Sequence, residues 1–403
     1  MFTAGVRGRT STKRRGAGGA FVALAALAMG AAFAAPAQAA PKAYTFTKVA
    51  DSAANGFNPQ TLSVACPSIN NGGDIAFKSE RNTDAGVVDG IYRADAGGGI
   101  TPIFEVPAGG GALLANGSPS MNDSGQVSFG AISSEGVRTI MRGDGINLTT
   151  IASTTTEFAS FGDNTSINDL GEVAFDAVLD SGARGLFSGS DGVTTTTHYT
   201  DAVDATVDGS PARFSGIEDR PSINNSGEIA FLEEIQDTFD RQVYRGQEES
   251  FTTISAANPP RGLTSPLLNN SGTVAWQTSF SDEAGFFVDA IVTGDGDGAD
   301  TTVVDSSGAF NLFDSYAINS TGTVAFSATL DDDELGIPSI YVGPNAKKNR
   351  VIGSGDKFDD GTVAGVRFCE EGLNDSGELA FVAEIEDRNG EVRAAVFRAT
   401  LRR

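Results

Sequence analysis

Seven copies of one short pattern dominate the sequence. In each copy an Asn is followed three residues later by Gly and seven residues later by an aromatic ring, as in Asn168, Gly171 and Phe175. An aliphatic and a small residue lie directly before the ring, as Val173 and Ala174 do here. The seven Asn residues are Asn70, Asn122, Asn168, Asn224, Asn269, Asn319 and Asn374. Agreement at five positions in every copy indicates a protein built from repeats.

Each copy has the features of a β-hairpin corner. Val173 and Phe175 share one face of a strand, whereas Ala174 points to the other face. An Asn side chain bonds the backbone two residues further on, and Gly takes the positive φ that a tight turn requires. We therefore interpret the seven Asn residues as structural rather than as a ligand site.

The length of the repeat selects the architecture. Successive motif Asn residues are 45 to 56 residues apart. After the motif strand, each unit holds a second apolar run and a further strand-like run, at 185–187 and 194–199 in the third unit. Four short strands in about 50 residues indicate a propeller blade. We predict an all-β, seven-bladed β-propeller with four-stranded blades, in a single domain at residues 42–403.

The N-terminal strand is expected to close the ring. The seventh unit stops after its third strand at 396–401, while residues 44–50 resemble the fourth strand of other units. Their pairing would remove the exposed sheet edges of an open array. Cys66 and Cys369 occupy nearly equivalent places in the first and seventh units, which are neighbours only in a closed ring. We predict a disulfide between them, with two free buried thiols as the alternative.

Residues 1–39 have the features of a signal peptide. Basic residues precede an apolar stretch at 20–35, and Ala37-Gln38-Ala39 fits a cleavage site. The Arg14-Arg15 pair leaves both the general and the twin-arginine export routes open. We expect a secreted protein, extracellular or periplasmic, in a compartment that permits a disulfide. No other stretch reaches the length of a membrane span.

Acidity limits the partners. Removal of residues 1–39 takes away five basic and no acidic side chains, which lowers the net charge from −24 to −29. This charge argues against nucleic acid and against an anionic membrane surface. We expect a monomer that binds an unknown extracellular ligand, either a glycan or a protein.

Signatures of catalysis and of metal binding are scarce. The single histidine, His198, falls on a predicted outer strand and is interpreted as a surface residue. Asp295, Asp297 and Asp300 resemble the spaced oxygen ligands of a calcium loop. Other units place a plain Gly/Asp turn at the same point, so a turn is the favoured interpretation and calcium the alternative. No other cofactor is expected.

A group of charged residues precedes the short inner strands and is expected near one mouth of the central channel. The group comprises Asp163, Glu218, Asp219, Arg220, Asp314, Glu370 and Glu371. The candidates for acid/base chemistry on a sugar are Glu218, Asp219, Glu370 and Glu371. Solvated loop residues are the favoured interpretation. The loops around these residues, among them 153–164, 306–314 and 353–367, are expected to carry any binding specificity.

The motif resembles that of bacterial extracellular proteins built from tandem Asn-x-x-Gly-x-x-x-Phe repeats, over the whole chain after residue 39. The resemblance implies a secreted or surface-anchored propeller-like protein whose biochemical role is largely unassigned. With few chemical signatures, we predict a non-catalytic binding or interaction module. The alternative is an extracellular hydrolase or lyase that acts on polysaccharide through carboxylates at the channel mouth.

Overall fold

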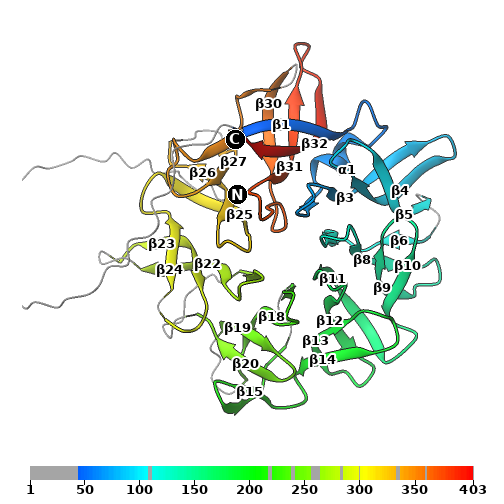
Figure 1. The fold of residues 1–403 in the computed structure, drawn as a ribbon, viewed down its shortest axis with the longest axis vertical. Coiled ribbons are helices and arrows are strands. Elements are labelled where there is room, and N and C mark those ends of the chain that lie inside the picture. Colours follow the sequence, from blue (N-terminus) through cyan, green and yellow to red (C-terminus); the bar gives the residue numbers. More distant parts are fainter. Residues whose placement is uncertain are drawn as a thin grey trace, which may run out of the picture. The chain divides into compact units, whose positions relative to one another are not determined.

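The computed structural model describes residues 44–107, 111–216, 220–236, 241–255, 264–281, 285–298, 300–332, 336–358 and 361–402. These residues belong to one compact unit, 40–403. In the described part of the chain the strands form seven sheets, and the sheets are arranged in sequence order around a central axis (Figure 1). The protein is a seven-bladed β-propeller, and the predicted fold class is confirmed. The predicted signal peptide, residues 1–39, lies outside the described residues.

The sheets are numbered as blades in chain order. Blade 1 holds β2 (Ser68–Ile69), β3 (Ile75–Thr83), β4 (Gly86–Ala94) and β5 (Ile100–Pro107), preceded by the helix α1 (Pro59–Ser63). Blade 2 holds β6 (Leu113–Leu114), β7 (Ser120–Met121), β8 (Val127–Ile132), β9 (Arg138–Gly143) and β10 (Leu148–Ser153). Blade 3 holds β11 (Phe158–Ile167), β12 (Val173–Leu179), β13 (Arg184–Gly189) and β14 (Thr195–Thr200).

The remaining blades follow the same order with additions at their edges. Blade 4 holds β17 (Ser222–Ile223), β18 (Ile229–Glu234), β19 (Arg241–Gln247) and β20 (Ser250–Thr253), extended outward by β15 (Ala205–Val207) and β16 (Ser210–Ala212). Blade 5 holds β21 (Leu267–Leu268), β22 (Val274–Ser281), β23 (Phe287–Gly294) and β24 (Thr301–Asp305). Blade 6 holds β25 (Phe310–Ile318), β26 (Val324–Leu330), β27 (Ser339–Val342) and β28 (Arg350–Gly353). Blade 7 holds β29 (Lys357–Phe358), β30 (Gly361–Arg367), β31 (Leu379–Glu386), β32 (Val392–Leu401) and β1 (Tyr44–Asp51).

The first strand in the described part of the chain completes the last blade. β1 pairs antiparallel with β32, with Tyr44 opposite Leu401 and Asp51 opposite Ala395 (Figure 1). The predicted disulfide joins Cys66, just before blade 1, to Cys369 of blade 7, with the two Cα atoms 5.4 Å apart. That prediction is confirmed.

The hydrophobic core is divided among the blades. Buried apolar residues form seven clusters among the described residues, and each cluster lies between two adjacent blades. All seven motif rings are at most 4% exposed: Phe77, Phe129, Phe175, Phe231, Trp276, Phe326 and Phe381. Burial of one such side chain contributes about 1.5–3 kcal/mol. Neighbouring blades therefore stabilise one another through the repeated ring.

Three predicted loops are partly strands. β11, β25 and β30 extend into the expected loops 153–164, 306–314 and 353–367. In the first two, pairs of aromatic rings such as Phe158 and Phe161 are buried between blades, which fixes the backbone against the next strand. The loop assignment was wrong there because the spacing of these rings differs from simple alternation.

Candidate functional site at the central channel

The seven motif turns lie around the central channel. In each turn the Asn side-chain oxygen accepts the N–H of the residue four positions later, at 2.9–3.0 Å. The motif Gly adopts a φ between +74° and +82° in all seven, which an L side chain rarely adopts. The Asn and Gly of each copy are thus required by the turn itself, as the sequence predicts.

The same Asn residues also connect the blades. Nδ2 of Asn168, for example, donates to the main-chain oxygen of Asn224 in the next blade at 3.0 Å. Six such links are present between described residues, made by Asn70, Asn122, Asn168, Asn269, Asn319 and Asn374. The repeated amide therefore serves two purposes at once, the turn and the junction.

A second polar ring was not predicted. In six of the seven repeats the residue after the motif Asn uses its side-chain oxygen to accept a main-chain N–H from the neighbouring blade, as Asp123 does from Asn71 at 2.8 Å. The sequence carries a signal for this ring, because all seven residues are small and polar: Asn71, Asp123, Asp169, Asn225, Asn270, Ser320 and Asp375. All seven line a pocket of about 170 Å³ on the channel axis.

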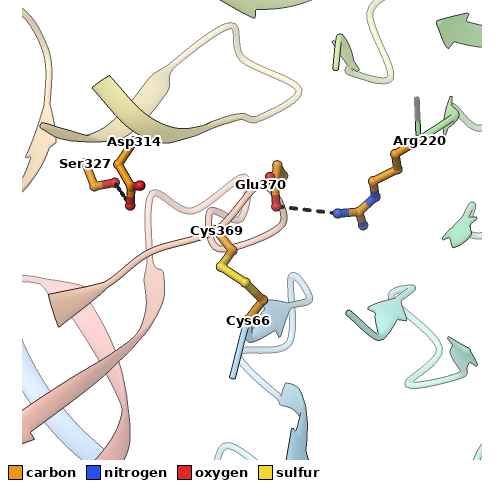
Figure 2. Close-up of a disulfide and its surroundings, with 6 residues drawn as sticks. All are labelled: Cys66, Arg220, Asp314, Ser327, Cys369 and Glu370. Carbon is orange, nitrogen blue, oxygen red and sulfur yellow. Dashed lines mark hydrogen bonds and ion pairs between the residues drawn. A yellow bond between two sulfur atoms is a disulfide. The ribbon is translucent and has the colours of Figure 1, made fainter. Parts of the chain in front are cut away.

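A charged cluster lines the same pocket. Nη2 of Arg220 in blade 4 lies 2.5 Å from Oε1 of Glu371, and Nη1 lies 3.5 Å from Oε2 of Glu370, both in blade 7. The Arg220 side chain is 8% exposed, against 35% for Glu370 and 25% for Glu371. Arg220 therefore reaches across the channel from one blade to another (Figure 2).

A break in the inner strand of blade 7 places Glu370 and Glu371. Glu370 and Glu371 form a turn between β30 and Leu373, which pairs separately with Leu379. The disulfide at Cys369 fixes the beginning of the same turn against blade 1, as Figure 2 shows. The turn is thereby positioned beside Arg220.

Asp314 and Asp163, two other described members of the predicted group, lie apart from this cluster. Asp314 is in β25, where Oδ2 accepts a hydrogen bond from Ser327 at 3.4 Å, apart from Arg220 (Figure 2). Asp163 is in β11 and is not among the residues that line the pocket. Glu218 and Asp219 lie outside the described residues. Arg220, Glu370 and Glu371 are therefore the part of the group that the structure brings together.

The interpretation of His198 as a surface residue was wrong. His198 lies on the outer strand β14 but is only 2% exposed, and Glu248 and Glu249 in the turn between β19 and β20 bond to it. Its Nε2 lies 2.9 Å from Oγ of Ser188. Burial lowers the pKa of His198 to about 4. The imidazole is therefore neutral at pH 7.

The calcium candidates lie in the turn between β23 and β24. Asp295 and Asp297 are exposed, and Oδ1 of Asp295 accepts the N–H of Asp297 at 3.0 Å, as in an ordinary Asx turn. Asp300 is half-buried. Within the described ranges, no three His, Cys, Asp or Glu side chains are grouped to hold a metal ion. Calcium binding at Asp295, Asp297 and Asp300 stays a prediction.

The channel offers polar contacts in a small volume. Ligand pockets are typically about 300–1,000 Å³, so the pocket of about 170 Å³ suits an ion or a few water molecules rather than a polymer.

None of the helices that the structure describes has the length and apolar character needed to cross a bilayer.

One family model matches most of the chain. A family model described as a family of unknown function, DUF7453, matches residues 43–257 and 268–401. A comparison with curated proteins found no significant match.

Solved structures resemble the chain at low identity. A protein of unknown function from Dyadobacter fermentans is 10% identical with a TM-score of 0.36, covering 89% of this chain and 99% of that one. The Pyrococcus horikoshii acylaminoacyl peptidase is 11% identical with a TM-score of 0.46, covering 82% and 51% of the two chains. The polysaccharide lyase Uly1 is 8% identical with a TM-score of 0.43, covering 83% and 89%. This chain spans about half the length of the peptidase, and these likenesses concern the fold alone.

Proposed function

The chain belongs to the DUF7453 family of unknown function, and on that premise we propose that it is an exported, non-catalytic propeller that acts as an extracellular binding module for a glycan or a protein. Export is supported by the signal-peptide features of residues 1–39 and by the disulfide between Cys66 and Cys369. Disulfides persist in oxidising compartments outside the cytosol.

One observation carries the non-catalytic part of the proposal. Glu370 and Glu371 are adjacent residues of one turn, and both face the guanidinium of Arg220. A glycosidase instead places an acid and a second carboxylate on opposite sides of the scissile bond. The pocket of about 170 Å³ also leaves little room for a sugar polymer. The arrangement therefore favours a structural ion pair over a catalytic pair of carboxylates.

We therefore assign ligand binding to the outer loops of the blades. The hairpin of β22 and β23 in blade 5 exposes aromatic side chains, with Phe280 at 41%, Phe286 at 63% and Phe287 at 66% exposure. Aromatic rings supply large contact areas for sugars and for protein partners. Phe287 is the residue to vary first, since it lies at the beginning of β23 and is the most exposed of the three.

A paired binding and turnover assay tests this proposal. Residues 40–403, with the disulfide formed, are screened against extracellular polysaccharides and proteins, and the same polymers are assayed for newly released chain ends. We expect binding without turnover, weakened at least tenfold by Phe287→Ser. Turnover that disappears when Glu218, Asp219, Glu370 and Glu371 are all changed to amides would establish the polysaccharide-active enzyme instead. Amino-terminal sequencing of exported protein is expected to begin at Ala40.

A further inference from the structure

His198 occupies a position that is aliphatic in five other blades. The outer strand of each of these blades has an irregularity in its register, and the extra residue there is Val49, Ile103, Ile151, Val303 or Val351. In β14 the extra residue is His198. The repeats thus provide an internal comparison, in which an apolar side chain is the common solution.

The neighbouring strand changes with it. Four blades have an Arg at the end of the third strand, and this Arg donates to the carbonyl of the motif Gly in the next blade, as Arg93 does to Gly125. The others are Arg142, Arg245 and Arg398. Blade 3 has Ser188 at this position. At the junction of blades 3 and 4, His198 thus stands where five blades have an aliphatic residue, and Ser188 stands where four blades have an Arg.

The two replacements form one hydrogen-bonded chain. The N–H of Glu248 donates to Nδ1 of His198 at 3.5 Å, so Nδ1 is unprotonated and Nε2 carries the hydrogen. Nε2 then donates to Oγ of Ser188 at 2.9 Å, and that hydroxyl donates to Oε1 of Glu172 at 2.5 Å. Ser188 is fully buried. Every group in this chain is satisfied by a neutral imidazole.

The contacts of His198 continue to the outer edge of blade 4. Glu248 and Glu249 adopt φ values of +47° and +65°, a left-handed conformation that is strained for residues other than Gly. The N–H of Glu249 donates to the main-chain oxygen of His198 at 2.7 Å, and the oxygen of Glu249 accepts the N–H of Thr206 in β15 at 2.7 Å. β15 itself pairs with β20. The strained turn thus connects His198 to the added strand.

We propose that His198 is the proton sensor of a latch that holds the turn between β19 and β20, together with β15, against blade 3. A proton on Nδ1 replaces the acceptor of the Glu248 N–H with a second donor, so that bond is lost. The turn then leaves its left-handed conformation, and the hydrogen bond from the Thr206 N–H to the oxygen of Glu249 is broken.

The charged groups around His198 also favour the open turn once the ring is protonated. The acidic groups on the elements around His198 are Glu172 before β12, Asp176 in β12, Asp201 after β14, Asp208 after β15, and Glu248 and Glu249 after β19; the basic groups are Arg184 in β13 and Arg241 and Arg245 in β19. The acids outnumber the bases, and they attract the imidazolium once burial is relieved by the opening of the turn. At neutral pH, burial keeps His198 uncharged and the latch closed.

The single histidine of the chain makes the test direct. In protein with nitrogen-15-labelled histidine, the ring shifts are expected to report the Nε2-protonated tautomer at pH 7 and a midpoint near 4. Amide exchange at Thr206, Glu248 and Glu249, corrected for its intrinsic pH dependence, is expected to rise at least tenfold between pH 6 and pH 4. The equivalent outer strand of blade 2, β10, serves as the control and is expected to remain protected.

Two variants separate the latch from general acid unfolding. His198→Ile restores the aliphatic residue of the other blades, and His198→Gln keeps a polar side chain without a titratable ring. In either variant the acid-dependent rise in exchange at Thr206, Glu248 and Glu249 is expected to disappear. An equal rise in the variants, or a histidine midpoint near the ordinary value of about 6.5, would overturn the proposal.

Discussion

The side-chain amide of Asn374 donates a hydrogen bond to the main-chain oxygen of Asn70 at 3.0 Å, across 304 residues of sequence. The same bond joins neighbouring blades within the chain, where the two Asn residues belong to successive repeats. The seam between blades 7 and 1 is therefore built like an internal junction. Ring closure adds β1 and the disulfide to this repeated contact.

Replacement of one motif Asn tests this junction. Asn168→Ala removes bonds from Leu170 N and Glu172 N and the bond to the oxygen of Asn224. At about 1 kcal/mol for each bond, we expect the free energy of unfolding to fall by about 3 kcal/mol. Urea denaturation of residues 40–403 measures this change.

Two further variants define the origin of the loss. Leu170→Ala alters a 75% exposed side chain in the same turn and is expected to change stability by less than about 0.5 kcal/mol. Asn168→Asp keeps the acceptor of the turn but loses the donor to blade 4. Its loss in free energy of unfolding is therefore expected to lie between those of Asn168→Ala and Leu170→Ala. Equal losses for Asn168→Ala and Leu170→Ala would contradict the role of the amide.

Removal of the disulfide tests ring closure. Cys66 and Cys369 close a loop with a sequence separation of 303, and the chain-entropy model assigns a stabilisation of about 6 kcal/mol to such a loop. Cys66→Ala/Cys369→Ala is expected to lower the free energy of unfolding by up to this amount, and so to lower the urea midpoint, but still to fold, because β1 and the Asn374 bond remain. Reductant is expected to destabilise the wild type and to leave the double variant unchanged.

The elements that the sequence predicts well depend on local chemistry. Asn168 and Gly171 determine a turn within four residues, and seven copies of that turn determine the ring and its closure. The Cys66–Cys369 bond then follows, because a closed ring makes the first and seventh units neighbours.

The rest depends on contacts between blades. The Asn168–Asn224 bond requires the distance between two turns, which no single repeat encodes. The burial of His198 depends on contacts from the next blade, where Glu248 and Glu249 in the turn between β19 and β20 bond to it. The contact of Arg220 with Glu371 requires a residue just before β17 and a turn after β30, in two different blades, to face the same channel.

Arg220 is expected to stabilise the charged turn. Arg220→Met keeps most of the side-chain length but leaves Glu370 and Glu371 without their guanidinium. Because both carboxylates are partly solvated, we expect a loss of about 1–3 kcal/mol, below the cost of a fully buried pair. In a double-mutant cycle, adding Glu371→Gln to Arg220→Met is expected to recover part of that loss. Strictly additive losses would contradict a direct interaction.

The closing strand is expected to weaken in alkali. Burial raises the pKa of Tyr44, at the beginning of β1, to about 12. In the unfolded chain the phenol ionises near its ordinary value of about 10, so the folded state holds its proton more tightly and the stabilisation present below pH 10 is lost as the pH rises to 12. Tyr44→Phe cannot ionise and is expected to match the wild type at pH 8 but to exceed it by up to about 2 kcal/mol at pH 12. Urea unfolding at both pH values, with the other tyrosines common to both proteins, measures the difference; parallel losses in the two proteins would show that Tyr44 does not contribute to the alkaline transition.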